Sequence, residues 1–253
     1  MSEQSTEETT NASPEEVVRL HNCFWEGEIK LGQVTAWSKD LLAPPQDVFV
    51  ISLGSPGGSC SYAAELLERL EVKRNPIVLI ARSLIGSAAW GIFLAPNVIR
   101  LTYANTCWMQ HEPTYTLNGL SHDQIETFFP YSINLGQSFY KLIKEGAGLT
   151  EKEAKDVIST KEYWSLGLDV LWLGERGLVD GVIFKEIDET SWVILTRQGF
   201  KKINAWNKPS AIKDLPLMTD EELAPFDLKQ YVPTKPKRLT AKDAIKSLDY
   251  LTK

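Results

Sequence analysis

The chain has 253 residues, of which 43% are hydrophobic and 24% charged, and its formal net charge is −6. A chain of this length can bury a core without help from disulfides or a structural metal. The acidic balance disfavours nucleic-acid binding, which usually depends on a basic face. No run approaches the roughly 18 apolar residues of a membrane span, and the first residues lack the pattern of a signal peptide.

Cysteine and histidine usage narrows the chemistry further. There are three cysteines without CxxC spacing: Cys23, Cys60 and Cys107. An odd number in this pattern is typical of reduced thiols in a cytoplasmic protein. The three histidines lie far apart along the chain: His21, His111 and His122. We therefore predict neither a metal site nor a bound cofactor.

In chain order, residues 1–15 are acidic and nearly free of large apolar groups, which predicts a disordered N-terminus. Apolar runs then alternate with helical patterns. The runs 48–53 and 77–80 are typical of buried parallel strands, and residues 61–72 between them have the spacing of an amphipathic helix. A small-residue helix is expected over 87–95.

Short strands are expected next at 98–102 and 106–110. Ser121 begins a helical stretch that runs to about Lys144 and stops at two glycines, and Thr150 begins a further capped helix. This alternation of strands and helices indicates an α/β fold.

After about residue 185 the pattern changes. Residues 192–196 can form one more strand, but from residue 207 the chain is rich in Pro and Lys and weakly periodic, which predicts an extended or partly disordered tail. We therefore divide the chain into a disordered segment (1–15), a folded domain (16–185) and a C-terminal extension (186–253).

The first segment with a chemical signature is Ser55-Pro56-Gly57-Gly58, which follows a buried strand and precedes a helix. Paired glycines let the backbone approach a substrate, and N–H groups near a helix start can face developing negative charge. A plain strand-to-helix turn is the alternative interpretation of a Gly-Gly pair.

The second segment places Ser87 among small residues at the start of the 87–95 helix. A serine hydroxyl is a weak nucleophile and needs a base within hydrogen-bonding reach. Helix capping is the alternative role for this serine. The third segment, 109–113, ends a strand with His111 before a proline turn, where the histidine is either a base or a structural core residue.

Together these segments resemble the proteolytic subunit of Clp-type ATP-dependent serine proteases. In that family a strand ends in Ser-Pro-Gly-Gly, a small-residue helix start carries the nucleophile, and Met-x-His-x-Pro carries the base. Here 29 residues separate Gly58 from Ser87 and 24 separate Ser87 from His111, within about one residue of the family pattern. Residues 175–180 are similar to the family's Tyr-Gly-Leu-Val-Asp ending. Signal peptide peptidases of the serine type and phage head-maturation proteases are more loosely similar.

The resemblance covers about residues 24–185 and implies site roles for individual residues. Ser87 would be the nucleophile, His111 the general base, and the backbone N–H groups of Gly58 and Ala88 the oxyanion hole. Gly57 would contact substrate. The segment around Ser87 reads Gly-Ser-Ala-Ala-Trp-Gly where the family usually has Ala-Ser-Met-Gly, and we expect the bulky Trp90 to narrow or reshape the substrate pocket.

The third member of the triad is less clearly marked. Glu162 falls at the position of the family's aspartate, and Asp156 is the fallback. The alternative is that both are surface carboxylates that do not reach His111.

The resemblance further implies the fold and the partners. We expect a Clp protease/crotonase-like spiral of strand–strand–helix units with a protruding handle helix supplied by residues 114–146. The expected function is a serine endopeptidase acting on small or unfolded polypeptides inside a ring-shaped homo-oligomer, with an ATP-driven unfoldase as partner and no nucleic acid or membrane. Two alternatives stay open: a non-catalytic structural or regulatory ring subunit, and a crotonase-type enzyme that processes acyl-CoA.

Overall fold

The computed structural model describes residues 18–115, 119, 121–159 and 161–226. The segment 1–15 and the end of the tail lie outside these residues. The strands are β1 (Leu20–Glu26), β2 (Val48–Ser55), β3 (Ile77–Gly86), β4 (Ile99–Tyr103), β5 (Cys107–Gln110), β6 (Tyr163–Leu166), β7 (Gly181–Asp188), β8 (Ser191–Thr196) and β9 (Gly199–Asn204). The α-helices are α1 (Leu31–Asp40), α2 (Cys60–Glu71), α3 (Ala89–Ile92), α4 (His122–Ala147), α5 (Glu151–Val157), α6 (Gly167–Leu171) and α7 (Asp220–Leu223). Two 3₁₀ helices follow the strands, η1 (Pro209–Asp214) and η2 (Ala224–Phe226).

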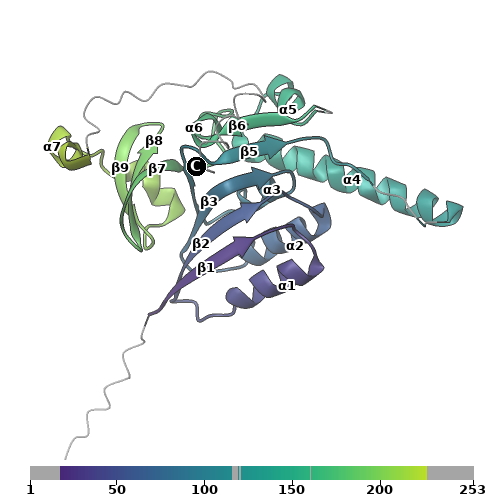
Figure 1. Cartoon of the computed structure of the whole chain (residues 1–253), viewed down its shortest axis with the longest axis horizontal. Coiled ribbons are helices and arrows are strands. Elements are labelled where there is room, and N and C mark those ends of the chain that lie inside the picture. The colour runs from purple at the N-terminus through teal and green to yellow at the C-terminus, as the bar shows by residue number, and fades with distance from the viewer. Residues whose placement is uncertain (1–17, 116–118, 120, 160, 227–253) are drawn as a thin grey trace, which may run out of the picture.

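The described strands form one mixed sheet in the order β1-β2-β3-β4-β7-β8-β9, with β5 beside β3 and β6 beside β5 (Figure 1). The β1–β2, β2–β3, β3–β4, β4–β7 and β3–β5 pairs are parallel, whereas the β5–β6, β7–β8 and β8–β9 pairs are antiparallel. On the side away from β2, strand β3 has two partners. Its first half pairs with β4, and its second half, after a register shift, pairs with β5. The end of β3 is thus carried next to the end of β5.

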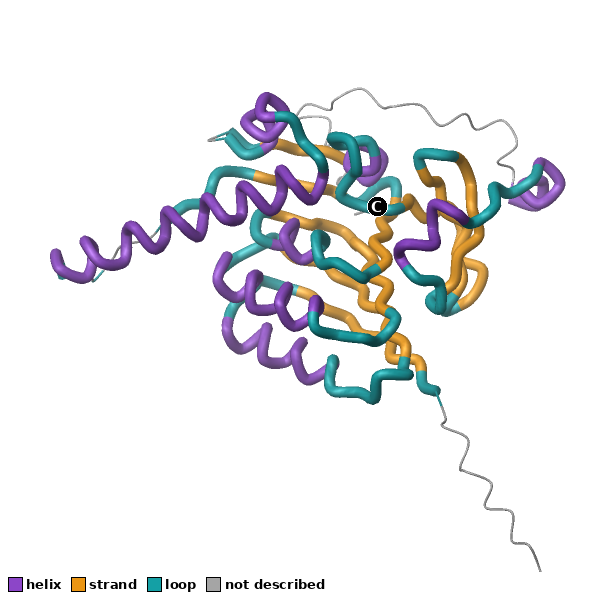
Figure 2. Tube along the Cα trace, turned by 180° about the vertical axis from the view of Figure 1, so that it is seen from behind, coloured by secondary structure: helices purple, strands orange, loops and turns teal. Residues whose placement is uncertain are grey.

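Both faces of the parallel strands are covered (Figure 2). On one face, Phe49 and Ile51 of β2 pack in a cluster with residues of helices α1 to α4. On the other face, Val48 and Val50 pack in a second cluster with residues of β8, β9 and η1. Strands buried on both sides need nearly continuous apolar sequence, which explains the 48–53 run, where Ser52 alone is polar.

The expected strand at 192–196 is confirmed as β8, but it joins the main sheet together with β9. Strand β7 itself spans the expected domain boundary at residue 185. Lys201 of β9 ties the following segment down, since its buried Nζ donates to the carbonyls of Ile212 at 2.8 Å and Lys213 at 2.7 Å. Residues up to Asn204 therefore belong to the sheet, and η1 is tied to it through Lys201.

Helix α4 is the longest element and projects from the body (Figures 1 and 2). Ser121 and Gln124 form its capping box, and Gly148 ends it in a left-handed conformation with φ of 67°. The predicted start at Ser121 is confirmed, and the helix runs three residues beyond the predicted end at Lys144. Ser132 is the first buried residue along α4, so the helix before it is largely exposed. No helix in the described ranges combines the length and apolar character needed to cross a membrane.

Candidate active site

Ser87 lies in a sharp turn between β3 and α3. Its φ is +50°, a left-handed conformation that costs a non-glycine residue of the order of 1–2 kcal/mol. The backbone N–H of Ser87 donates to the carbonyl of Met109 in β5 at 2.8 Å, which holds this conformation. A strained strand-to-helix turn of this kind presents a serine hydroxyl at the end of a sheet in nucleophile elbows.

The Ser87 side chain does not cap helix α3. The N-cap position belongs to Ala88, and no side-chain hydrogen bond caps this helix. The hydroxyl of half-buried Ser87 has no hydrogen-bond partner among the described residues. It is therefore left available to a base or a substrate.

His111 follows the end of β5, with its ring half-buried. Its Nδ1 lies 2.8 Å from the backbone carbonyl oxygen of Glu112. A carbonyl oxygen only accepts, so this contact places the proton on Nδ1 and leaves Nε2 as an acceptor. This segment is also tied to the chain before β6, because the Glu112 N–H donates to the carbonyl of Ser159 at 2.9 Å. The imidazole thus has the tautomer that a general base needs.

Gln110 joins the two segments. Its Oε1 accepts from the backbone N–H of His111 at 2.9 Å, and its Nε2 donates to the carbonyl of Ser87 at 3.3 Å. Sequence reasoning missed this residue. The signal for it was a lone amide in an otherwise apolar strand just before the histidine.

The Gly57-Gly58 backbone lies against the serine turn. A Cβ added to Gly57 would stand 2.6 Å from the Ser87 Cβ and 3.2 Å from the Ala88 nitrogen. The Gly57 N–H is already used, since it donates to the Ser55 Oγ at 3.1 Å.

Gly58 forms a parallel bridge with Ile29, in which the carbonyl of Gly57 and the N–H of Ser59 make the hydrogen bonds. The Gly58 N–H therefore faces away from Ile29. Within the described ranges, neither this N–H nor that of Ala88 has an acceptor. Two backbone donors are thus free in the segments that flank Ser87.

Ser87, His111 and Gly58 line one cavity of about 450 Å³. Its outer wall is formed by residues 113–115 and by helix α4 from Phe128 to Gly136. Among the described residues that line it, none is Asp, Glu, Lys or Arg. The cavity is large enough for a sizeable side chain, and its walls favour an uncharged one.

These observations can be set beside known proteins. No protein-family model matches the sequence, and no curated protein matches it. Among solved structures, a point mutant of ClpP1 from Listeria monocytogenes superposes with a TM-score of 0.55 at 20% identity. The match covers 64% of this chain and 91% of that chain. The chain has a Clp protease-like fold.

The structure does not bring the expected acid to His111. Within this Clp protease-like fold, Glu162 is exposed and its Oε2 accepts from the indole nitrogen of Trp164 at 2.9 Å. Asp156 is exposed on α5. No carboxylate of the described residues hydrogen-bonds to His111, and no hydrogen bond joins the His111 ring to Ser87. Strand register still places Glu162 near His111, because Tyr163 pairs with Gln110.

Trp90, which we expect to shape the substrate pocket, is not among the described residues that line the cavity. Trp90 is fully buried, and its indole nitrogen donates to the carbonyl of Ile85 at 3.1 Å. Its ring makes edge contacts with Trp108 and Tyr163. The physical reason is that the serine turn directs the short helix α3 inward, so its large side chain packs in the core.

Tyr115 closes the cavity against α4. Its hydroxyl donates to the carbonyl of Ser132 at 2.9 Å. A Cβ at Gly136 would overlap the Tyr115 hydroxyl, so the glycine makes room for this contact. Burial raises the pKa of Tyr115 and that of the Cys60 thiol in the same cavity, which keeps both groups neutral near pH 7.

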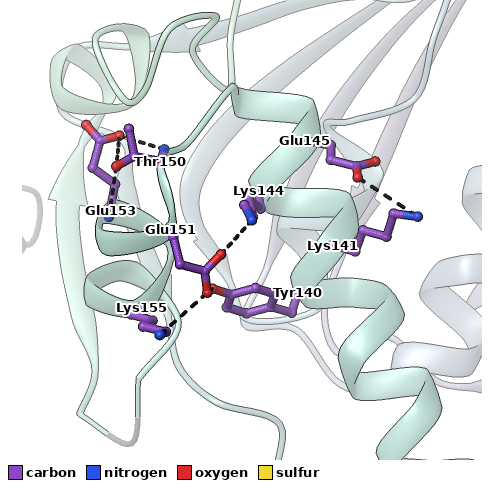
Figure 3. Close-up of polar contacts among 8 residues, drawn as sticks. All are labelled: Tyr140, Lys141, Lys144, Glu145, Thr150, Glu151, Glu153 and Lys155. Carbon is purple, nitrogen blue, oxygen red and sulfur yellow. Dashed lines mark hydrogen bonds and ion pairs between the residues drawn. The ribbon is translucent and has the colours of Figure 1, made fainter.

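The C-terminal half of α4 is anchored to α5 (Figure 3). Glu151 accepts from the Tyr140 hydroxyl at 3.1 Å and from the Lys144 ammonium at 2.6 Å. Hydrogen bonding to Lys144 and Tyr140 lowers the pKa of Glu151, and the same contact raises the pKa of Lys144. The helix is thus fixed where it borders the site, and its far end is left exposed.

Proposed function

We propose that the protein is a serine endopeptidase that hydrolyses small or unfolded polypeptides. The observation that carries this proposal is the convergence of a strained serine turn, a histidine whose Nε2 has no partner among the described residues, and a cavity whose described lining holds no Asp, Glu, Lys or Arg. Each of these is built from a different part of the chain: Ser87 after β3, His111 after β5, and the cavity wall from α4. The Clp protease-like fold supports the proposal at the level of architecture.

The reaction follows the logic of acyl transfer. His111 Nε2 removes the proton from Ser87 Oγ as the oxygen attacks the substrate carbonyl carbon. The N–H groups of Gly58 and Ala88 donate to the oxyanion that forms. The imidazolium then gives its proton to the leaving amine, and the acyl group stays on Ser87. A water molecule, deprotonated by His111, hydrolyses the ester and restores both side chains.

The orienting role of the triad acid falls to the Glu112 carbonyl in the present structure. A carbonyl holds the tautomer but stabilises the imidazolium less than a carboxylate does. Strand register places Glu162 near His111, and its carboxylate can take over this role once it leaves Trp164. The proposal therefore includes Glu162 as the acid of a rearranged, substrate-bound state.

We also propose that the chain assembles into a ring-shaped homo-oligomer with α4 as its handle. The support is a group of exposed aromatic side chains on α4, of which Phe128 and Tyr131 also line the cavity: Phe128 (46% exposed), Phe129 (42%) and Tyr131 (55%). A second copy of the chain is the occupant we expect for this face. Partnership with an ATP-driven unfoldase rests on the resemblance alone. Native mass measurement tests the assembly, and a monomer at micromolar concentration would contradict it.

The decisive experiment is hydrolysis of unstructured peptides by the full-length protein. Ser87→Ala should lower the rate by roughly 10³-fold or more, and His111→Gln by about 10²–10⁴-fold. Ser138→Ala, an exposed position on α4, is the matched control and should keep full activity.

A non-catalytic ring subunit is the second candidate. Among the described residues, no hydrogen bond joins Ser87 to the His111 ring and no carboxylate bonds to that ring, which favours this candidate. A folded wild-type protein without peptidase activity, in its oligomeric state, would establish this second candidate over the first.

A further inference from the structure

Gln110 is a buried amide at the end of β5, only 3% exposed. Burying an amide is unfavourable unless its polar atoms are paired. Both of its polar atoms are paired, and both partners belong to the backbone of a candidate catalytic residue. One is the His111 N–H at 2.9 Å, and the other is the Ser87 carbonyl at 3.3 Å.

The Ser87 backbone is held at both ends by neighbouring residues of β5. Met109 accepts from its N–H, and Gln110 donates to its carbonyl. A residue held at a φ of +50° persists only where its surroundings over-determine it. The amide therefore does more than fill space: it fixes the strained turn and the start of the histidine segment relative to each other.

We infer that Gln110 is a positioning residue for the Ser87–His111 pair, an inference that rests on the proposed function. Its neutral amide sets the separation of the two segments without adding charge beside the imidazole. The other titratable side chains lining the small pocket around Gln110 are Cys60 and Tyr140. Burial raises the pKa of both, so both stay neutral between about pH 5 and 8, where an imidazole titrates.

The test uses two variants and a matched control in the full-length protein. Gln110→Met keeps the shape and removes both hydrogen bonds. It should lower kcat by about 10- to 100-fold with KM little changed, because small displacements of reacting groups are costly. Gln110→Glu keeps an acceptor for the His111 N–H but places negative charge beside the ring. It should move the acidic limb of the pH–rate profile to higher pH, since a nearby anion favours the imidazolium.

Asn75→Leu is the control. Asn75 is 5% exposed, and its amide donates to the carbonyls of Pro44 at 2.6 Å and Asp47 at 2.9 Å, away from the site. This variant should lose stability to a similar degree while the folded fraction keeps its kcat and pH profile.

Equal kcat in Gln110→Met and wild type, or an unmoved acidic limb in Gln110→Glu, would overturn this inference while the proposed function stands. The same holds if Asn75→Leu loses kcat as much as Gln110→Met does. A wild-type protein that is inactive on peptides would overturn both together.

Discussion

Gly57 offers the sharpest test of how the site is packed. Its φ is +101°, and an added Cβ would meet the Gly86 oxygen and the Ser87 Cβ, each at 2.6 Å. Gly27 provides a matched control, because its φ is +104° but nothing lies within 4 Å of its Cβ position. Alanine at either site meets nearly the same backbone strain, and only alanine at residue 57 meets a clash.

The expected losses of unfolding free energy follow from the backbone strain and from the clash of the added Cβ. Gly27→Ala should cost about 1–2 kcal/mol of unfolding free energy from the left-handed conformation. Gly57→Ala should cost a further 1–3 kcal/mol or so for overpacking, or about 2–5 kcal/mol in total. To regain ordinary contact, the Ser87 Cβ must move from 2.6 to about 3.4 Å from the new methyl group. A displacement of this size should lower the reactivity of Ser87 by about 10²-fold.

Urea unfolding measures the stability difference between the two variants, and the rate of covalent labelling of Ser87 measures the effect on the site. We expect normal labelling in Gly27→Ala and strongly reduced labelling in Gly57→Ala. Equal losses of stability in both variants, with equal labelling, would refute the close approach of Gly57 to the serine turn.

Three further predictions concern strain, pH and the second face of the sheet. The Ser87→Gly variant should be more stable than Ser87→Ala by about 1 kcal/mol of unfolding free energy, because glycine tolerates the left-handed conformation. At helical Ser138 the order should be reversed, with Ser138→Ala more stable than Ser138→Gly by a similar margin. Urea titration of the four variants checks this, and the same order at both positions would show that the turn is unstrained. The hydrogen bond from His21, at 2.7 Å, lowers the pKa of Asp47 in the folded protein. The Asp47 carboxylate therefore stabilises the fold above about pH 4, and this stabilisation is lost as the pH falls through the lowered pKa of the folded state. Asp47→Asn should flatten the acid limb of a stability–pH curve, and an unchanged limb would argue against this pair. Ile194→Ala in β8 should cost about 2–5 kcal/mol because the side chain is fully buried against the parallel strands, whereas Ile187→Ala, at a 40% exposed position, should change stability by less than about 0.5 kcal/mol. Similar small effects at both positions would mean that the C-terminal strands are not part of the core.

Much of the fold was predictable because burial leaves a continuous apolar signature. The runs 48–53 and 77–80, predicted as strands, lie in β2 and β3 of the structure. The helices predicted to start at Ser121 and Thr150 begin where their capping boxes predict. Elements with weaker patterns were missed. Strand β1 lies at the sheet edge and mixes His, Asn and Glu with apolar residues, so its sequence shows neither a continuous run nor strict alternation.

Residue types and their spacing predict which segments form the candidate site, but not the conformation of its side chains and backbone. The Ser87 and His111 segments do line one cavity, but the left-handed φ of Ser87 follows from tertiary contacts with β5 rather than from local sequence. The partner of His111 depends on side-chain orientation, which spacing does not fix, and Glu162 bonds to Trp164 instead. The burial of Trp90 follows from the direction in which the turn sends α3.

Covalent labelling by a fluorophosphonate, mapped by peptide mass spectrometry on the full-length protein, tests the central claim most directly. The account predicts a single adduct on Ser87, formed more slowly at acidic pH and nearly absent in His111→Gln. A folded protein that stays unlabelled, or an adduct that persists in Ser87→Ala, would contradict it.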